Sequence, residues 1–307
     1  MVAVVAAIAV VLVRYRDILP HAMRLDLRVL AGVSALVILG YLLNAVAFKA
    51  TAARVGVRLT LAESVMLQLA VYTLNHLPMK SGTVLQGAIM RSRHGVRVAD
   101  FVSLSAATQL MTLWSAGTIG GLFVVTSGAH PAALGWVMLV VPSAGLAALV
   151  AWGRAHGPGE RPEPAGRVAR MLVRAAYGTR ELFGDVRLVL LLVAVNIGIV
   201  LVLAVRMHLV FGAVGVGLGG QQSIVVAATG LFAYMFGLLP GGLGFREGGI
   251  AGAAAMVGVG SAVGLAAAVL DRAVDLVWVL LLGVPATLYL SRTQAAHPPE
   301  QTPGDAA

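Results

Sequence analysis

Four ionisable residues in the last quarter of the sequence lie in strongly apolar surroundings. Glu247 follows a Gly-rich stretch, and Asp271, Arg272 and Asp275 interrupt the apolar segment 262–290. A charge at the centre of a membrane helix costs about 2.5–3.5 kcal/mol on insertion scales, so such residues need partners. The two aspartates are four residues apart and share one helix face. The set could line a cavity that receives a phosphate or ammonium headgroup, or it could be a neutralising cluster that only pins helices together.

A smaller polar group precedes a helix break in the first half of the sequence. Asn75 and His76 stand just before the break and Lys80 lies within it. This lysine is a candidate phosphate contact, and the alternative is a side chain that extends to the membrane interface. Arg206 and His208 stand near a helix end, where we expect the same extension toward the interface.

No motif of an enzyme is present. The sequence contains no serine nucleophile elbow, no H-E-x-x-H and no Walker sequence, and its seven histidines lack the spacing of metal ligands. The absence of cysteine excludes disulfides, thiolate zinc sites and iron–sulfur clusters. We therefore expect no catalytic activity, no metal and no cofactor.

The composition requires a membrane environment. Apolar residues make up 59% of the 307 residues and charged residues only 11%, whereas a soluble domain carries about 25% charged residues. The net charge of +9 comes mainly from arginines in loops, as the positive-inside rule predicts for a membrane protein. Nucleic-acid binding is a poor alternative, because no basic patch contains aromatic stacking residues. The sequence thus predicts an all-α, multi-pass helix bundle in the cell membrane.

The apolar blocks have bilayer length and set the expected elements. We expect one transmembrane domain over 1–290 and a disordered tail over 291–307. Residues 2–13 are read as the end of a first helix. The full-length spans are predicted at 27–48, 101–125, 133–152, 186–211 and 262–290, with shorter apolar segments at 61–78, 221–239 and 248–259. The spacing at Gly248/Gly252 and Gly260/Gly264 predicts close helix packing.

Lys and Arg counts give the orientation. The arginine-rich segment 154–187 is predicted to be a cytoplasmic linker, and the uncharged loop 126–132 is predicted to lie outside. Apolar residues recur at helical spacing from Val168 to Ala175, so the part 167–187 is a candidate amphipathic helix that contacts anionic lipids of the inner leaflet. The alternative is a plain connecting helix.

Two helix breaks share one pattern, in which an apolar helix ends in Leu-Pro and a Gly and a short second arm follow. Proline breaks a helix and glycine permits the reversal that follows. The break residues are Pro78 and Gly82 in the first copy, and Pro240, Gly241, Gly242 and Gly244 in the second. Three predicted spans separate the copies, which would invert the second. The pattern predicts an inverted repeat of two broken or re-entrant helix pairs, about 27–126 and 188–290. The alternative is two unrelated loops.

The second copy, Leu239-Pro240-Gly241-Gly242-Leu243-Gly244-Phe245-Arg246-Glu247, resembles the signature of a flippase-like family. This family includes the transmembrane domain of lysylphosphatidylglycerol synthases. Arg272 resembles an arginine on the family's next helix, and Asn75 to Pro78 with Gly82 resembles its first-half element. The similarity runs from about Leu27 to Leu290. It implies a standalone membrane domain, without the soluble synthase domain, that moves a phospholipid or lipid-linked precursor between leaflets.

The first half departs from the family pattern at four positions. Thr83 and Gln86 stand where the family usually has an acidic residue and an arginine, and Thr108 and Gln109 replace a charged pair. Two alternatives to the flippase reading stay open: a membrane enzyme or subunit of polyprenyl-phosphate sugar or lipid transfer, and a non-transporting scaffold. Membrane lipids are the expected partners, and coupling to ATP would need a partner ATPase.

Overall fold

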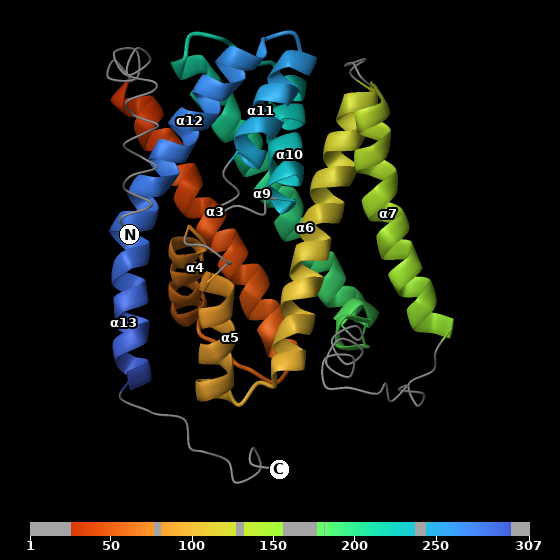
Figure 1. Ribbon diagram of the computed structural model, residues 1–307, viewed down its shortest axis with the longest axis vertical. Coiled ribbons are helices and arrows are strands. Elements are labelled where there is room, and N and C mark those ends of the chain that lie inside the picture. The colour runs from red at the N-terminus through yellow and green to blue at the C-terminus, as the bar shows by residue number, and fades with distance from the viewer. Residues whose placement is uncertain are drawn as a thin grey trace.

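The computed structural model describes residues 26–76, 81–126, 132–155, 177–180, 182–236 and 244–295, and these form helices without a strand. In Figure 1, α6 and α7 lie at one side of the molecule and α12 and α13 at the other, with α10 and α11 and the pair α4 and α5 between them. In chain order the helices are α3 (Leu27–Arg54), α4 (Leu61–Asn75), α5 (Ser81–His94), α6 (Val98–Thr126), α7 (Ala132–Ala155), α9 (Val186–Ala213), α10 (Gly220–Met235), α11 (Phe245–Met256), α12 (Ser261–Trp278), the π-helical turn η3 (Val279–Gly283) and α13 (Val284–Ala295).

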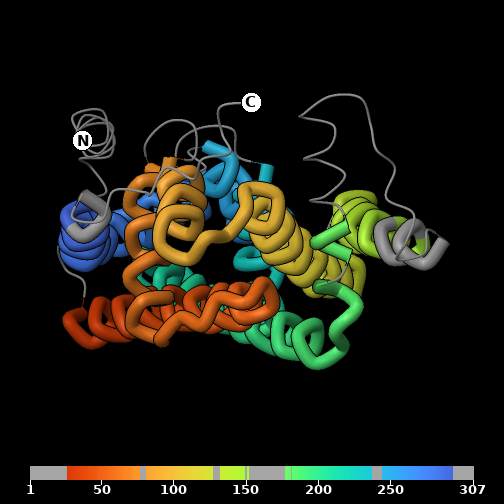
Figure 2. The backbone as a smooth tube through the Cα atoms, turned by 90° about the horizontal axis from the view of Figure 1, so that it is seen from below, coloured from red at the N-terminus to blue at the C-terminus, as the bar shows by residue number. Residues whose placement is uncertain are grey.

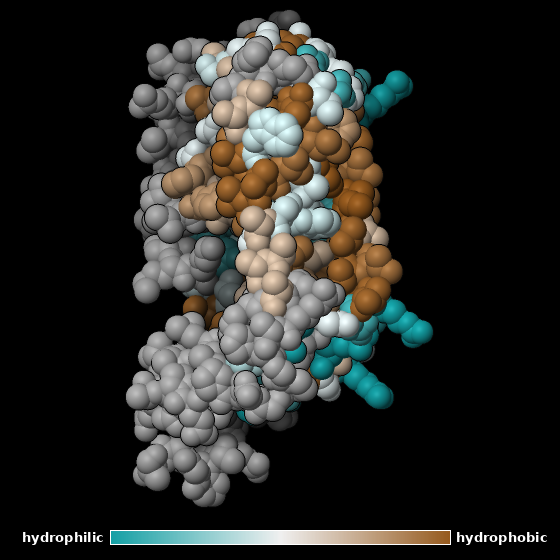
Figure 3. All heavy atoms as spheres, turned by 90° about the vertical axis from the view of Figure 1, so that its right-hand side faces the viewer, coloured by the Kyte–Doolittle hydropathy of each residue, from teal (hydrophilic) through white to brown (hydrophobic). Residues whose placement is uncertain are grey.

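Four helical stretches are long and apolar enough to cross a membrane. They are Leu27–Arg54, Val98–Thr126, Val186–Ala213 and Ser261–Arg292, with Ala132–Ala148 as a shorter apolar helix. Hydrophobic residues cover the middle of the face shown in Figure 3, and hydrophilic side chains project near its ends. Together these features confirm the predicted all-α, multi-pass bundle.

The helices α3 and α9 pack side by side and run antiparallel. Leu43 lies against Gly198 in the middle of the pair, and Leu209 lies against Gly32 toward its other end. Arg54 at the end of α3 forms an ion pair with Asp185 at the start of α9. In Figure 2, α3 lies along one side of the molecule, with α4, α5 and α6 stacked above it.

These two helices begin alike. Each has 28 residues and starts at an aspartate whose side chain accepts a hydrogen bond from an arginine N–H two residues later. The aspartates are Asp26 and Asp185, and the arginines are Arg28 and Arg187. An acceptor at this position satisfies one of the N–H groups that a helix start leaves unpaired.

The segments that follow the two helices also correspond. Each helix is followed two residues later by a glycine with positive φ, Gly56 at 84° and Gly215 at 87°. A short helix, α4 or α10, then begins five residues after the glycine. The side chain of its third residue accepts a hydrogen bond from the backbone N–H of the residue that caps the helix. Glu63 accepts from the Thr60 N–H at 2.7 Å, and Gln222 accepts from the Gly219 N–H at 2.8 Å. The two halves therefore repeat a helix, a turn and a capped second helix in the same order and spacing.

The side chain that caps α4 is ionisable, because it is Glu63, whereas the corresponding side chain of α10 is the neutral Gln222. The hydrogen bonds from the backbone N–H and the hydroxyl of Thr60 lower the pKa of Glu63 below its ordinary value. A lowered pKa in the folded state means that this cap stabilises the protein above the ordinary glutamate pKa and weakens as pH falls through the folded value. We expect the protection factors of the amides at the start of α4, which compare exchange with that of an unfolded chain at the same pH, to fall on acidification, whereas those at the start of α10 should show no such loss.

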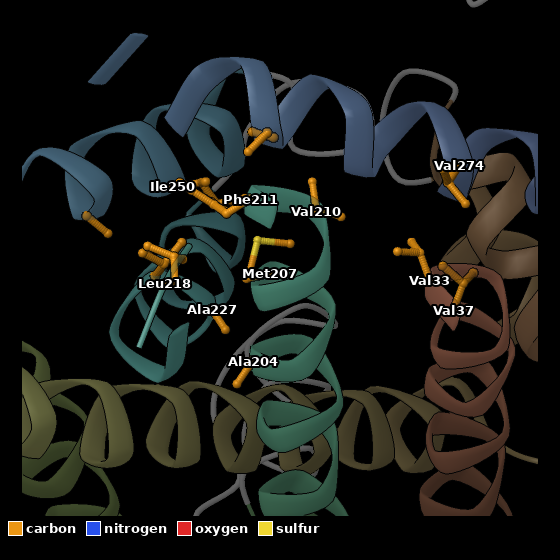
Figure 4. Close-up of a cluster of buried hydrophobic side chains, with 14 of the residues drawn as sticks. Val33, Val37, Ala204, Met207, Val210, Phe211, Leu218, Ala227, Ile250 and Val274 are labelled. Carbon is orange, nitrogen blue, oxygen red and sulfur yellow. The ribbon is translucent and has the colours of Figure 1, made fainter. Parts of the chain in front are cut away.

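The largest hydrophobic cluster lies where the second half meets α3. Figure 4 shows Met207, Val210 and Phe211 of α9 pointing toward residues of α3, α10, α11 and α12. Small residues make this contact close: a Cβ on Gly230 would lie 2.6 Å from Ile250 Cγ1, and one on Gly264 would lie 2.6 Å from the Cβ of Ala254. The core thus fixes α10, α11 and α12 against one another and against α9.

The predicted close packing is confirmed for Gly264, but it was wrong for Gly248, Gly252 and Gly260. Gly248 and Gly252 have nothing within 4 Å of an added Cβ, and Gly260 caps α12 with a positive φ of 95°. Instead Gly249 packs on α10, where a Cβ would lie 2.5 Å from that of Ala233. The spacing predicted that a small-residue face exists, but it could not show which face α10 covers.

This contact gives a matched pair of substitutions. We expect Gly249→Ala to reduce the free energy of unfolding by about 1–3 kcal/mol, because the added methyl overpacks the α10 contact. Gly248→Ala, one residue earlier in the same helix, should be neutral or stabilising by up to about 1 kcal/mol through helix propensity. Thermal unfolding of the two variants in detergent tests this, and equal losses would contradict the packing assigned here.

Candidate functional site

A cavity of about 250 Å³ lies between the two halves of the bundle. The residues that flank both helix breaks line it: Asn75, His76 and Thr83 on one side, and Tyr234 and Arg246 on the other. The breaks themselves, 77–80 and 237–243, lie outside the described residues, and with them Lys80, Pro78, Pro240, Gly241 and Gly242. The described ends of the α4/α5 and α10/α11 pairs thus face one common space.

The centre of the site is a buried carboxylate that two arginines share. Asp271 of α12 has no exposed surface. Its two oxygens accept from Arg206 Nε at 2.5 Å and Arg206 Nη2 at 2.6 Å, and one of them also contacts Arg246 Nη2. Bidentate arginine–carboxylate contacts are among the strongest and most directional in proteins. This cluster ties α9, α11 and α12 together.

The position of Arg206 corrects the sequence-based interpretation. We expected its side chain to extend to the membrane interface, yet it is 5% exposed and paired to Asp271. The residue stands about two turns before the end of α9, and the pairing carboxylate lies 65 residues away. The position of Arg206 within its helix therefore did not predict its environment, because its partner Asp271 lies on a helix that is distant in the sequence and near only in the fold.

A second buried pair joins α11 to α12. Arg272 Nη1 contacts Glu247 Oε1, as expected from the sequence, and Glu247 Oε2 accepts from the Gly244 N–H at 2.8 Å. Gly244 has a φ of 84°, a conformation that favours glycine, and it caps α11. Glu247 therefore pairs a charge and satisfies a helix start at once.

The remaining acid of the predicted set has a weaker partner. Asp275 lies 3.9 Å from Arg206 Nη1 and accepts a hydrogen bond from the Tyr41 hydroxyl at 3.1 Å. It shares a helix face with Asp271, as its spacing predicted, and its side chain keeps 20% exposure. Tyr41 was not singled out from the sequence, because an aromatic residue in an apolar helix carries no signal of its partner.

The first-half break is held by its own polar side chains. Asn75 Oδ1 accepts from the Thr83 backbone N–H at 3.3 Å, and His76 Nδ1 lies 2.8 Å from the Tyr72 carbonyl. Gly82 is buried against α4, where a Cβ would overlap the carbonyl of Val71. Glycine at this position thus lets the second arm pack directly onto the first.

Four positions that depart from the family signature line the same cavity. These are Thr83, Gln86, Thr108 and Gln109, and Asn44, Gln68, Ser105 and Thr112 lie among them. Within the described residues no cluster of His, Cys, Asp and Glu could hold a metal ion. The site offers arginines and neutral hydrogen-bonding groups, whose chemistry suits a polar or phosphorylated group.

The segment 167–187 is described only from 177 to 180 and from 182 onward. Its described part packs on α6: Tyr177, Thr179 and Leu182 are buried, and the Thr179 hydroxyl lies 3.3 Å from the Ser103 carbonyl. The predicted apolar stripe from Val168 to Ala175 lies outside the described residues, so its contact with anionic lipids stays a prediction.

Comparison with known proteins gives two findings. Residues 1–283 match the family described as the lysylphosphatidylglycerol synthase TM region. A UPF0104 membrane protein from Methanothermobacter thermautotrophicus is 33% identical over 87 residues, a stretch that covers 28% of this chain and 25% of that protein. The match thus spans about a quarter of the curated relative. No solved structure matched the chain.

Proposed function

This chain belongs to the family of the lysylphosphatidylglycerol synthase transmembrane region, and on that premise we propose that it translocates a phospholipid or lipid-linked precursor between leaflets of the cell membrane. The observation that carries the proposal is the cavity between the halves. Residues that flank both helix breaks line it, and so do three arginines. A lipid headgroup needs a polar path through the bilayer, because polar groups are costly in hydrocarbon.

The repetition of α3–α4 and α9–α10 supports the proposal. The two long helices run antiparallel, and each leads through the same turn into a capped short helix that ends at a break. Inverted repeats with broken helices at a shared site are the usual architecture of carriers that alternate access. We infer that the two halves are inverted copies and that the cavity is the site they share.

Proteoliposomes test the proposal. The purified protein is reconstituted with NBD-labelled phospholipids, and dithionite reduces only the outer-leaflet label. We expect the reducible fraction to rise well above the half seen in protein-free vesicles. The variant Arg246→Gln should slow the rise at least tenfold, whereas Val277→Ala, on an exposed face of α12, should not.

The same assay separates the competing functions. A scaffold would leave the reducible fraction at the protein-free level, and so would an enzyme of polyprenyl-phosphate transfer. The enzyme would in addition convert a polyprenyl-phosphate substrate, which thin-layer chromatography of the recovered lipids would show. No catalytic step is part of the proposal.

A further inference from the structure

The wall of the cavity is divided by charge. Among the described residues, every charged side chain that lines it comes from the second half: Arg206, Arg246, Arg272 and Asp275. The first half contributes amides and hydroxyls instead, together with His76 and two tyrosines: Tyr41, Asn44, Gln68, Tyr72, Asn75, Thr83, Gln86, Ser105, Thr108, Gln109 and Thr112. Neutral polar side chains are costly in a membrane bundle unless they form hydrogen bonds. This wall therefore suits the part of a ligand that forms hydrogen bonds but carries no charge.

The Nε2 group of one of these amides has no hydrogen-bond partner among the described residues. Gln86 is 6% exposed, and its Nε2 group makes no hydrogen bond with the described residues. A buried donor without an acceptor is rare, because it loses its hydrogen bonds to water without replacement. Gln86 lines the cavity, but its Nε2 atom is itself covered, so an acceptor on a bound ligand would satisfy it once the side chain turns toward the cavity.

The carboxylates near the cavity are already engaged. Asp271 holds Arg206 and Arg246, and Glu247 holds Arg272. Asp275 accepts from Tyr41 and lies near Arg206. An ammonium headgroup carries only donors and is bound best by a carboxylate, and of the described carboxylates only Asp275, which already accepts from Tyr41, lines the cavity, so this wall suits it less well. Arg246, by contrast, contacts Asp271 through Nη2 alone among the described residues, which leaves donors of its guanidinium for an anion.

We propose that the lipid bound here has a phosphodiester whose headgroup is an uncharged polyol or sugar. The phosphate lies against Arg246, and the hydroxyls lie against the amide and hydroxyl wall, including Gln86 and Gln109. Hydroxyls both donate and accept, as amides do, so the two sets match. The cavity of about 250 Å³ has room for a polar headgroup. This inference rests on the proposed function.

The headgroup preference is measured by transport. Proteoliposomes carry NBD-acyl phosphatidylinositol or phosphatidylglycerol as polyol lipids, and NBD-acyl phosphatidylethanolamine or lysylphosphatidylglycerol as amine lipids. We expect initial rates at least tenfold higher for the polyol lipids. Equal rates, or faster movement of the amine lipids, overturn the headgroup assignment while the translocase proposal stands. Movement of none of the four overturns the translocase proposal.

Binding is measured separately with soluble headgroups. Inositol 1-phosphate is expected to raise the unfolding temperature in detergent by more than phosphoethanolamine or inorganic phosphate at the same concentration. An equal rise with inorganic phosphate would show that the site recognises the phosphate alone and would overturn the polyol assignment. This measurement does not depend on transport.

Substitutions of Gln109 and Gln86, two amides of the first-half wall, test the headgroup assignment further. Gln109 is exposed within its helix, so Gln109→Leu should fold normally and reduce the polyol preference at least fivefold. Gln109→Glu adds a carboxylate and should shift the preference toward the amine lipids. Gln86→Leu should act like Gln109→Leu, with a retained unfolding temperature as the check on folding. An unchanged preference in both leucine variants would contradict the inference.

Discussion

Asp271→Asn is expected to lower the free energy of unfolding by about 3–5 kcal/mol, the loss typical of removing one partner of a buried ion pair. The carboxylate has no exposed surface and accepts from two arginines. Asparagine keeps the shape and loses the charge, so Arg206 stays buried without a full counter-charge. Thermal or SDS unfolding in detergent measures the loss.

Asp275→Asn is the matched control for this prediction. It makes the same chemical change one turn along the same helix, at a carboxylate that is 20% exposed and 3.9 Å from Arg206. We expect a loss well below that of Asp271→Asn, because water and Tyr41 replace part of the interaction. Equal losses would show that burial does not set the cost. Removing the three charges together, with Arg206→Met, Arg246→Met and Asp271→Leu, should recover part of the stability, since apolar replacements of buried ion clusters are often tolerated.

The sequence predicted the helices better than the pairing of the charged side chains between them. Apolar blocks of bilayer length gave the long helices, because hydrophobic length is a local property of the chain. The pairing of Glu247 with Arg272 could also be predicted, since each was the nearest opposite charge on neighbouring helices. The pairing of Arg206 with Asp271 could not, because it depends on α9 packing against α12, and no local signal encodes that contact.

The sequence predicted a repeat from the Leu-Pro and Gly pattern at the two breaks, but the breaks lie outside the described residues. The clearest correspondence is at the starts of α3 and α9, where Asp-x-Arg recurs, and at Gly56 and Gly215. These residues are common at helix ends, so their meaning appears only when both helices are seen to have the same length and to lead into the same turn.

A double-mutant cycle on Glu247 and Arg272 is expected to show strong coupling. Each single change, Glu247→Gln or Arg272→Gln, should reduce stability by about 3–5 kcal/mol, because the surviving charge stays buried without compensation. The double variant should lose less than the sum of the two, since neither charge is then left alone. Unfolding of the four proteins in detergent gives the coupling, and strictly additive losses would contradict the contact.

Substitutions of Glu247 and of Arg272 should not have the same effect on stability. Glu247 has a second role, because its Oε2 accepts from the Gly244 N–H that starts α11. Glutamine keeps an oxygen for that bond, whereas Glu247→Leu removes it, so the leucine variant should lose a further 0.5–2 kcal/mol, about the value of a helix cap. For the same reason the exchange Glu247→Arg with Arg272→Glu should fail to restore stability: it preserves the ion pair in reverse but leaves the N–H of Gly244 facing a cation. Full rescue by the exchange would mean that the pair matters only as two opposite charges and that the cap contributes nothing.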